Sequence, residues 1–78
     1  MKQIRDRIEI NPEILVGKPV IAGTRIPVYV ILNLLAQGKD IAYILKQYPD
    51  LTREDIHAAL QFGADSVNFT EEPLSSHA

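Results

Sequence analysis

The run Gly-Thr-Arg-Ile-Pro-Val at residues 23–28 constrains the fold of this chain more than any other stretch. Gly23 can adopt a positive φ that other residues resist. Pro27 disfavours the α region at the residue before it and fits the first position of a helix. The run therefore predicts a switch from extended chain to helix. We expect it to act as a structural hinge made by Gly23, Thr24, Arg25 and Pro27.

Arg25 stands at the corner of this hinge and has two interpretations. Its planar guanidinium suits pairing with backbone carbonyls or with a carboxylate of the same subunit, and we favour this architectural role. The alternative is that Arg25 binds a ligand. Thr24 is interpreted as a turn or capping hydroxyl, because threonine commonly plays that part beside glycine.

The chain before the hinge is extended and interrupted by turns. Residues 7–10 (Arg-Ile-Glu-Ile) alternate polar and apolar side chains, which predicts a short half-buried strand. Asn11 and Pro12 form a turn, and residues 13–16 suit a single helical or 3₁₀ turn. Residues 20–22 (Val-Ile-Ala) predict a second strand. A two-stranded ribbon of this length must pack on helices or on another subunit to be stable.

The chain after the hinge is helical. The first helix is expected over residues 27–37, and Gly38 ends it in a left-handed cap. This helix is apolar on almost every side, which predicts burial on more than one face. Asp40 is the N-cap of a second helix that ends at or before Tyr48, because Pro49 follows.

The third helix has the most specific start signal in the sequence. Thr52 and Asp55 form a capping box, and Leu51 can pack on Ile56 as a hydrophobic staple. We expect an apolar stripe along this helix, made by Ile56, Ala59, Leu60, Gly63, Ala64 and Val67. The opposite face carries Arg53, Glu54, His57, Gln61 and Asp65. Periodicity ends at Asn68, so we predict one domain over residues 1–68 and a disordered tail over residues 69–78.

Size and composition indicate how such a fold is stabilised and where it works. A domain of 78 residues buries a modest share of its surface, and without cysteine it has no disulfide to reinforce it. Because 46% of the residues are apolar, we expect that a homodimer buries additional apolar surface and so stabilises the fold. No apolar run is long enough to cross a membrane, and the N-terminus does not resemble a signal peptide. We therefore expect a cytoplasmic protein that does not interact with membranes.

Motifs of enzymes are missing from the sequence. It contains no phosphate-binding or dinucleotide-binding glycine motif and no cysteine nucleophile. His57 and His77 are too far apart in the predicted structure to suggest a paired metal site. We predict a protein without catalytic activity, cofactor, metal or small-molecule substrate.

The predicted fold is mainly α, with a three-helix, homeodomain-like helix-turn-helix core and a short N-terminal β-ribbon. A plain three-helix bundle satisfies the same periodicity. In the helix-turn-helix interpretation the third helix reads DNA bases through Thr52, Arg53, His57 and Gln61. Phosphates would be contacted by Lys39 and Lys46, together with Arg5, Arg7 and Lys18.

The distribution of charge limits this DNA-binding interpretation. The net charge is −2, with five bases and three acids in residues 1–25 and three bases and seven acids in residues 26–78. Glu54 and Asp55 lie at the start of the candidate recognition helix, where we expect them to repel phosphates.

The longest distinctive string is Asn-Pro-Glu-Ile-Leu-Val-Gly-Lys-Pro-Val-Ile-Ala-Gly-Thr-Arg-Ile-Pro-Val at residues 11–28. It resembles the domain-of-unknown-function family 433, and the resemblance extends over residues 8–67, through Leu-Leu-Ala-Gln-Gly at 34–38 and Asp-Ile-His-Ala-Ala-Leu at 55–60. The resemblance implies a homeodomain-like helix-turn-helix fold. It also implies the antitoxin half of a prokaryotic toxin–antitoxin pair, encoded beside a PIN-like nuclease toxin.

Two functions from different classes follow as expectations. The first is a dimeric, antitoxin-like transcriptional regulator that binds its own promoter DNA. The alternative is a protein-interaction or dimerisation module that does not bind DNA, which the acidic residues of the third helix favour.

Overall fold

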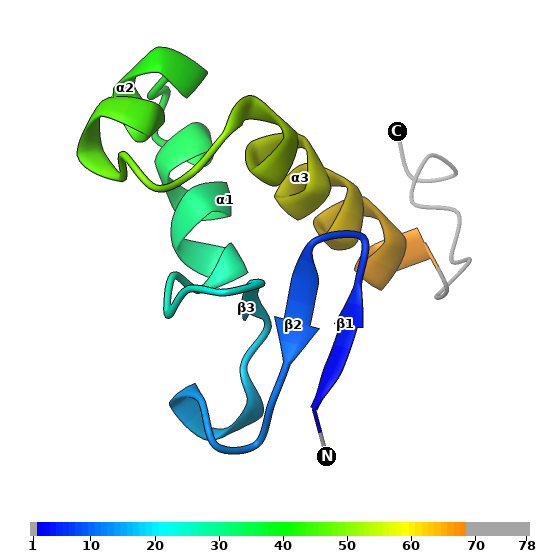
Figure 1. The fold of residues 1–78 in the computed structure, drawn as a ribbon. Coiled ribbons are helices and arrows are strands. Elements are labelled where there is room, and N and C mark those ends of the chain that lie inside the picture. Colours follow the sequence, from blue (N-terminus) through cyan, green and yellow to red (C-terminus); the bar gives the residue numbers. More distant parts are fainter. Residues whose placement is uncertain (1, 69–78) are drawn as a thin grey trace, which may run out of the picture.

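The computed structural model describes residues 2–68, so the predicted tail at 69–78 lies outside the described residues (Figure 1). Three short strands, a 3₁₀ turn and three helices follow one another along the chain. In order they are β1 (Gln3–Arg5), β2 (Ile8–Ile10), η1 (Leu15–Gly17), β3 (Val20–Ile21), α1 (Val28–Ala36), α2 (Ile41–Gln47) and α3 (Arg53–Asn68).

The strands form an antiparallel sheet in the order β1-β2-β3. Arg5 pairs with Ile8 across the first hairpin, and Ile8 pairs with Ile21 across the second. The prediction of a two-stranded ribbon was therefore wrong by one strand. Residues 3–5 contain a single apolar residue, Ile4, which is too short a pattern to predict a strand, and Ile4 is 55% exposed in the structure.

A two-residue turn joins β1 to β2. Its central residues, Asp6 and Arg7, have φ values of 50° and 71°, as the tight turns favoured in hairpins require. Asparagine and glycine usually occupy such positions. Asp-Arg carries no comparable sequence signal, so the hairpin could not be predicted from these two residues.

The hinge has the local structure that its residues favour. Gly23 has a φ of +81°. The Thr24 hydroxyl donates to the Ile21 carbonyl at 2.7 Å and accepts from the Ile26 N–H at 3.0 Å. Pro27 is extended and acts as the N-cap of α1, so the helix begins one residue later than predicted. The hinge thus joins β3 directly to α1.

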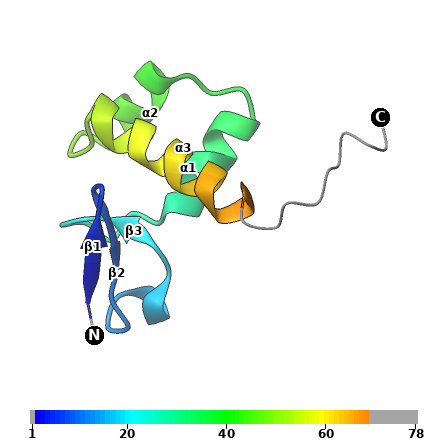
Figure 2. The same ribbon diagram turned by 90° about the vertical axis from the view of Figure 1, so that its right-hand side faces the viewer.

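The sheet packs at one end of the helices, and α2 lies at the other end, away from the sheet (Figures 1 and 2). One apolar core joins these parts. Its buried members are Ile8, Ile21, Val28, Ile31, Ile44, Leu51, Ile56 and Ala59. Every sheet and helix element except the edge strand β1 contributes a residue to this core, so the described residues form one packed unit.

The helix ends agree with their predicted signals. Gly38 has a φ of +90° after α1, and the N–H groups of Gly38 and Lys39 donate to the carbonyls of Leu35 and Leu34. This is the Schellman pattern of helix termination. The Asp40 side chain accepts from the Tyr43 N–H at 2.8 Å and caps α2.

One prediction of helix burial was wrong in detail. Helix α1 buries Val28 and Ile31, partly buries its other valine and leucine side chains, and exposes Tyr29. Helix α3 buries Ile56 and Ala59, whereas Leu60, Ala64 and Val67 are exposed. The reason is that α3 contacts both α1 and β2, which turns its Asp55 and Phe62 sides inward.

Candidate nucleic-acid interface

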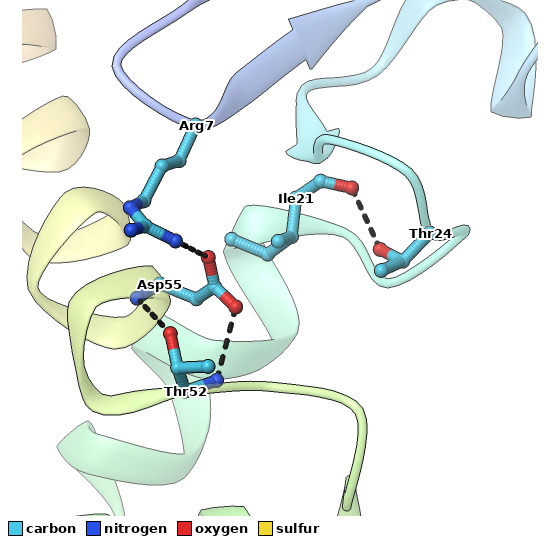
Figure 3. A network of polar contacts seen from close by, with 5 residues as sticks. All are labelled: Arg7, Ile21, Thr24, Thr52 and Asp55. Atoms are coloured by element: carbon cyan, nitrogen blue, oxygen red, sulfur yellow. Dashed lines mark hydrogen bonds and ion pairs between the residues drawn. The ribbon is translucent and has the colours of Figure 1, made fainter.

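The start of α3 is held by a network centred on Asp55 (Figure 3). One carboxylate oxygen of Asp55 accepts from the Thr52 N–H at 3.0 Å, and the Thr52 hydroxyl accepts from the Asp55 N–H at 3.2 Å. These two bonds confirm the predicted capping box. Leu51 and Ile56 are both buried in the core, as the staple requires.

The other oxygen of Asp55 accepts from the guanidinium of Arg7 at 3.1 Å. This charge-assisted bond connects the β1–β2 turn to a helix 48 positions later in the chain. The carboxylate is buried, while the Arg7 side chain is about half exposed. The network therefore fixes both the first turn of α3 and its position against the sheet.

Two expectations about DNA contacts are corrected by this network. Asp55 was expected to face phosphates and repel them, but it is buried and paired with a cation. Arg7 was expected to contact phosphates, but its guanidinium is paired with Asp55. The capping box was visible in the sequence. The Arg7 contact was not, because nothing in a local pattern links residues so far apart.

The outer side of α3 carries three of the predicted base-reading residues. Arg53, His57 and Gln61 are all exposed, and their spacing of four places them along one face of the helix. Within residues 2–68, the side chains of Arg53 and His57 make no hydrogen bond or ion pair. The Gln61 amide donates to the Asp65 carboxylate at 2.9 Å on the same exposed surface. Thr52 is exposed too, but its hydroxyl serves the capping box.

Glu54 adds a negative charge beside this face. A backbone hydrogen bond at Glu54 and a hydrogen bond with the Thr52 side chain lower the pKa of its carboxyl group, with smaller contributions from the charges of Arg7 and His57. An ionised carboxylate in the first turn is favourable for the helix, whose N-terminal end is positive. The same charge opposes a phosphate approaching the start of α3.

The two predicted phosphate-contacting lysines belong to the α2 region and lie at its opposite ends. Lys46 is exposed in the last turn of α2. Lys39 precedes α2, and its ammonium lies 5.0 Å from the centroid of the Tyr43 ring. Such a cation–π contact restricts the lysine side chain without removing its charge. The structure therefore gathers the base-reading candidates on α3 and keeps the lysines apart from one another.

Two other kinds of feature are absent from the described part of the chain, namely a metal site and a membrane span. No group of three or more histidine, cysteine, aspartate or glutamate side chains there is arranged to hold a metal. No described helix has the length and apolar character needed to cross a bilayer. A groove of about 520 Å³ separates the sheet from α3; its lining includes Arg5, Ile8, Ile10, Phe62 and Gln61.

The chain is similar to one protein family and to individual known proteins. The family described as "Protein of unknown function (DUF433)" matches residues 8–63. A protein of Sinorhizobium fredii, described as uncharacterized protein y4eO, is 38% identical over 55 residues, which are 70% of this chain and 25% of that protein. The chain thus spans a quarter of the length of this curated relative.

A solved structure agrees with the fold. The crystal structure of a DUF433 member protein from Anabaena variabilis superposes with a TM-score of 0.74 at 34% sequence identity. The alignment covers 78% of this chain and 60% of that one. Because the family match spans most of the chain and a related structure shares its fold, the chain belongs to the DUF433 family.

Proposed function

We propose that this protein is a DNA-binding transcriptional regulator of the antitoxin type, which binds its own promoter as a homodimer. Helices α2 and α3 form a homeodomain-like helix-turn-helix unit in this proposal, and α3 is the recognition helix. The observation that carries the proposal is the burial of Asp55 against Arg7. It removes one acid from the candidate face, where the exposed side chains of Arg53 and His57 make no hydrogen bond or ion pair within residues 2–68.

The chemistry of the face suits direct contact with bases. Arg53 can donate two hydrogen bonds to guanine, and Gln61 can pair with adenine once it leaves Asp65. Lys46, at the end of α2, supplies a charge for the phosphate backbone. Glu54 and Asp65 remain on the same helix and weaken each half-site, so a dimer that engages two half-sites raises the overall affinity.

The antitoxin role rests on the resemblance to DUF433 proteins rather than on geometry. It adds a second protein to the proposal, a PIN-like nuclease toxin encoded next to this chain. We expect the complex with that protein to bind the promoter more tightly than the antitoxin alone, because assembly increases the number of DNA-contacting units.

A mobility-shift titration with the upstream DNA tests the proposal, with and without the neighbouring gene product. We expect a shift at low salt that weakens as salt is added, since phosphate contacts release counterions. The double variant Arg53→Ala, Gln61→Ala should lose binding, because base contacts are each worth about 1–3 kcal/mol. It should keep its melting temperature, because both side chains are exposed.

The control is Asn33→Ala, which removes an exposed polar side chain from α1, a helix that the proposal does not place on DNA. We expect it to bind DNA nearly as the unmodified protein does. If no shift forms at low salt with either preparation, the DNA-binding proposal fails.

A second candidate function is a protein-interaction module that does not bind DNA. It is favoured by exposed apolar side chains, among them Tyr29 on α1 and Leu60 on α3, which is 42% exposed. Under this proposal the neighbouring gene product binds the purified chain directly, and Leu60→Ser weakens that complex while Arg53→Ala does not.

A further inference from the structure

Glu9 is a buried carboxylate with little to stabilise its charge. The side chain is only 5% exposed. One of its oxygens accepts from the Gly23 N–H at 3.2 Å. No cationic side chain in the described residues lies within ion-pair distance of Glu9. Burying a charge is costly unless the charge is paired and hydrogen-bonded, so a single backbone bond leaves Glu9 under-compensated.

Arg25, in contrast to Glu9, is an exposed charged residue, and it lines the same pocket as Glu9. It follows Gly23 by two residues in the hinge, is exposed, and makes no hydrogen bond or ion pair within residues 2–68. The architectural role expected for it, pairing with its own corner or with a carboxylate of the same subunit, is therefore not what the structure has. A pocket of about 520 Å³ is lined by Arg25, Glu9, Lys2, Ile4, Ile14, Gly23 and Thr24.

This pocket opens on the face of the sheet that turns away from α3. Side chains alternate between the two faces of a strand. Ile8 and Ile10 line the groove against α3, so Glu9 and its cross-strand partner Ile4 belong to the other face. Ile4 is 55% exposed there, so apolar surface that is open to solvent lies in the same pocket as Glu9.

The segment next to this face carries backbone strain. Val16, in η1, has a φ of +56° and its side chain is 92% exposed. A β-branched residue in the left-handed region is a genuine outlier, and such outliers cluster at functional sites such as ligand clamps and switch regions. Val16 presents an apolar side chain to solvent two positions after Ile14, which lines the Glu9 pocket.

We propose that the occupant of this pocket is Arg25 of a second copy of the chain. In a twofold dimer every contact occurs twice, so Arg25 of each copy pairs with Glu9 of the other. Arg25 and Glu9 carry opposite charges, and within residues 2–68 neither side chain has an ion-pair partner, although Lys2 also lines the pocket. Ile4 and Val16 supply the apolar surface that such an interface needs around its ion pairs.

The Arg25–Glu9 contact would form the homodimer on which the proposed function rests. This contact lies on the outer face of the sheet and not on the exposed face of α3. Dimerisation is measured without DNA, so the two proposals can fail separately.

Sedimentation equilibrium of the full chain is the first test. We expect a monomer–dimer equilibrium whose Kd rises at least about tenfold in Arg25→Ala and in Glu9→Gln, as loss of a charge-assisted contact predicts. Glu9→Gln keeps a side-chain oxygen for the Gly23 N–H. Arg53→Ala, which removes an equally exposed arginine from α3, is the matched control and should dimerise like the unmodified chain.

Mixing two variants distinguishes pairing between copies from pairing within one. Arg25→Glu alone places two carboxylates in each contact and should be monomeric. Mixed with Glu9→Gln, it can form a heterodimer that keeps one Arg25–Glu9 pair, so association should recover. A monomeric unmodified chain, a dimer unaffected by Arg25→Ala, or a mixture that stays monomeric while both variants are folded by circular dichroism would each overturn the proposal.

Discussion

At the scale of single residues, Asp55 connects local and long-range structure. Its backbone and one oxygen complete the capping box with Thr52, and its other oxygen pairs with Arg7. The same side chain therefore defines where α3 begins and how the sheet meets it. This double use explains why an acid at the start of a candidate DNA-contacting helix need not face the phosphates.

The stability of this network can be measured by urea unfolding. Thr52→Ala should lower the free energy of unfolding by about 1 kcal/mol, because it removes one N-terminal cap. Asp55→Ala should cost more, about 2–3 kcal/mol, since it leaves the Thr52 N–H and the part-buried Arg7 without an acceptor.

Glu54→Ala is the control, as Glu54 is the exposed neighbour of Asp55 in the same helical turn. Glu54→Ala should lower the free energy of unfolding by less than Asp55→Ala does. Equal losses for the two variants would mean that Asp55 acts only through its favourable charge at the helix end, and that the Arg7 contact contributes nothing.

Residue-scale predictions from the sequence succeeded where the partners are close along the chain. The Thr52–Asp55 box, the Asp40 cap and the Gly38 cap are all present. Contacts that need the folded chain were missed, namely Arg7 with Asp55 and Glu9 with Gly23. The alternating pattern of residues 7–10 predicts that the Glu9 side chain faces solvent. A local pattern does not show that the hinge covers this face, where the Gly23 N–H donates to Glu9.

At the scale of helices, the packing of α1 on α3 depends on Gly63. A β-carbon built at Gly63 would lie 3.1 Å from the end of the Leu32 side chain. This proximity gives a packing reason for a glycine inside this helix, where glycine lowers helix propensity.

Substitution at Gly63 should separate helix propensity from packing. Gly63→Ala gains up to about 1 kcal/mol of helix propensity and requires only the flexible end of Leu32 to move, so thermal unfolding should show unchanged or slightly raised stability. Gly63→Val should destabilise, because a branched side chain has no space beside Leu32 and gains less propensity.

Exposed Ala64, the next residue along α3, provides the comparison site. Ala64→Val should change stability only slightly. If Gly63→Val is tolerated as well as Ala64→Val, then α1 and α3 do not pack as closely as the structure has them.

Element-scale prediction was reliable for the helices and weaker for the sheet. Helix starts and ends carry chemical signals, and those of all three helices were recognised. Strand β1 has no such signal, since its neighbours in space come from β2 and its outer edge faces solvent. The buried side of α3 was misjudged because Leu60 and Phe62 are equally apolar, and only the positions of α1 and β2 decide which turns inward.

At the scale of the whole molecule, the two proposals use different surfaces. The exposed face of α3, with Lys46 of α2, is proposed for DNA, and the outer face of the sheet is proposed for a second copy. Arg7 and Asp55 connect the sheet to α3 through the turn between β1 and β2 (Figure 3). The relatives are longer than this chain. The family match over residues 8–63 includes Glu9, Arg25 and the candidate residues of α3, but not Ile4.

DNA binding by α3 is tested most directly by titrating the isotope-labelled protein with duplex from its own upstream region and following the amide chemical shifts. We expect the largest shift changes at Arg53, His57 and Gln61, with smaller changes at Lys46. Changes confined to the sheet, or none at low salt while the protein stays folded, would contradict it.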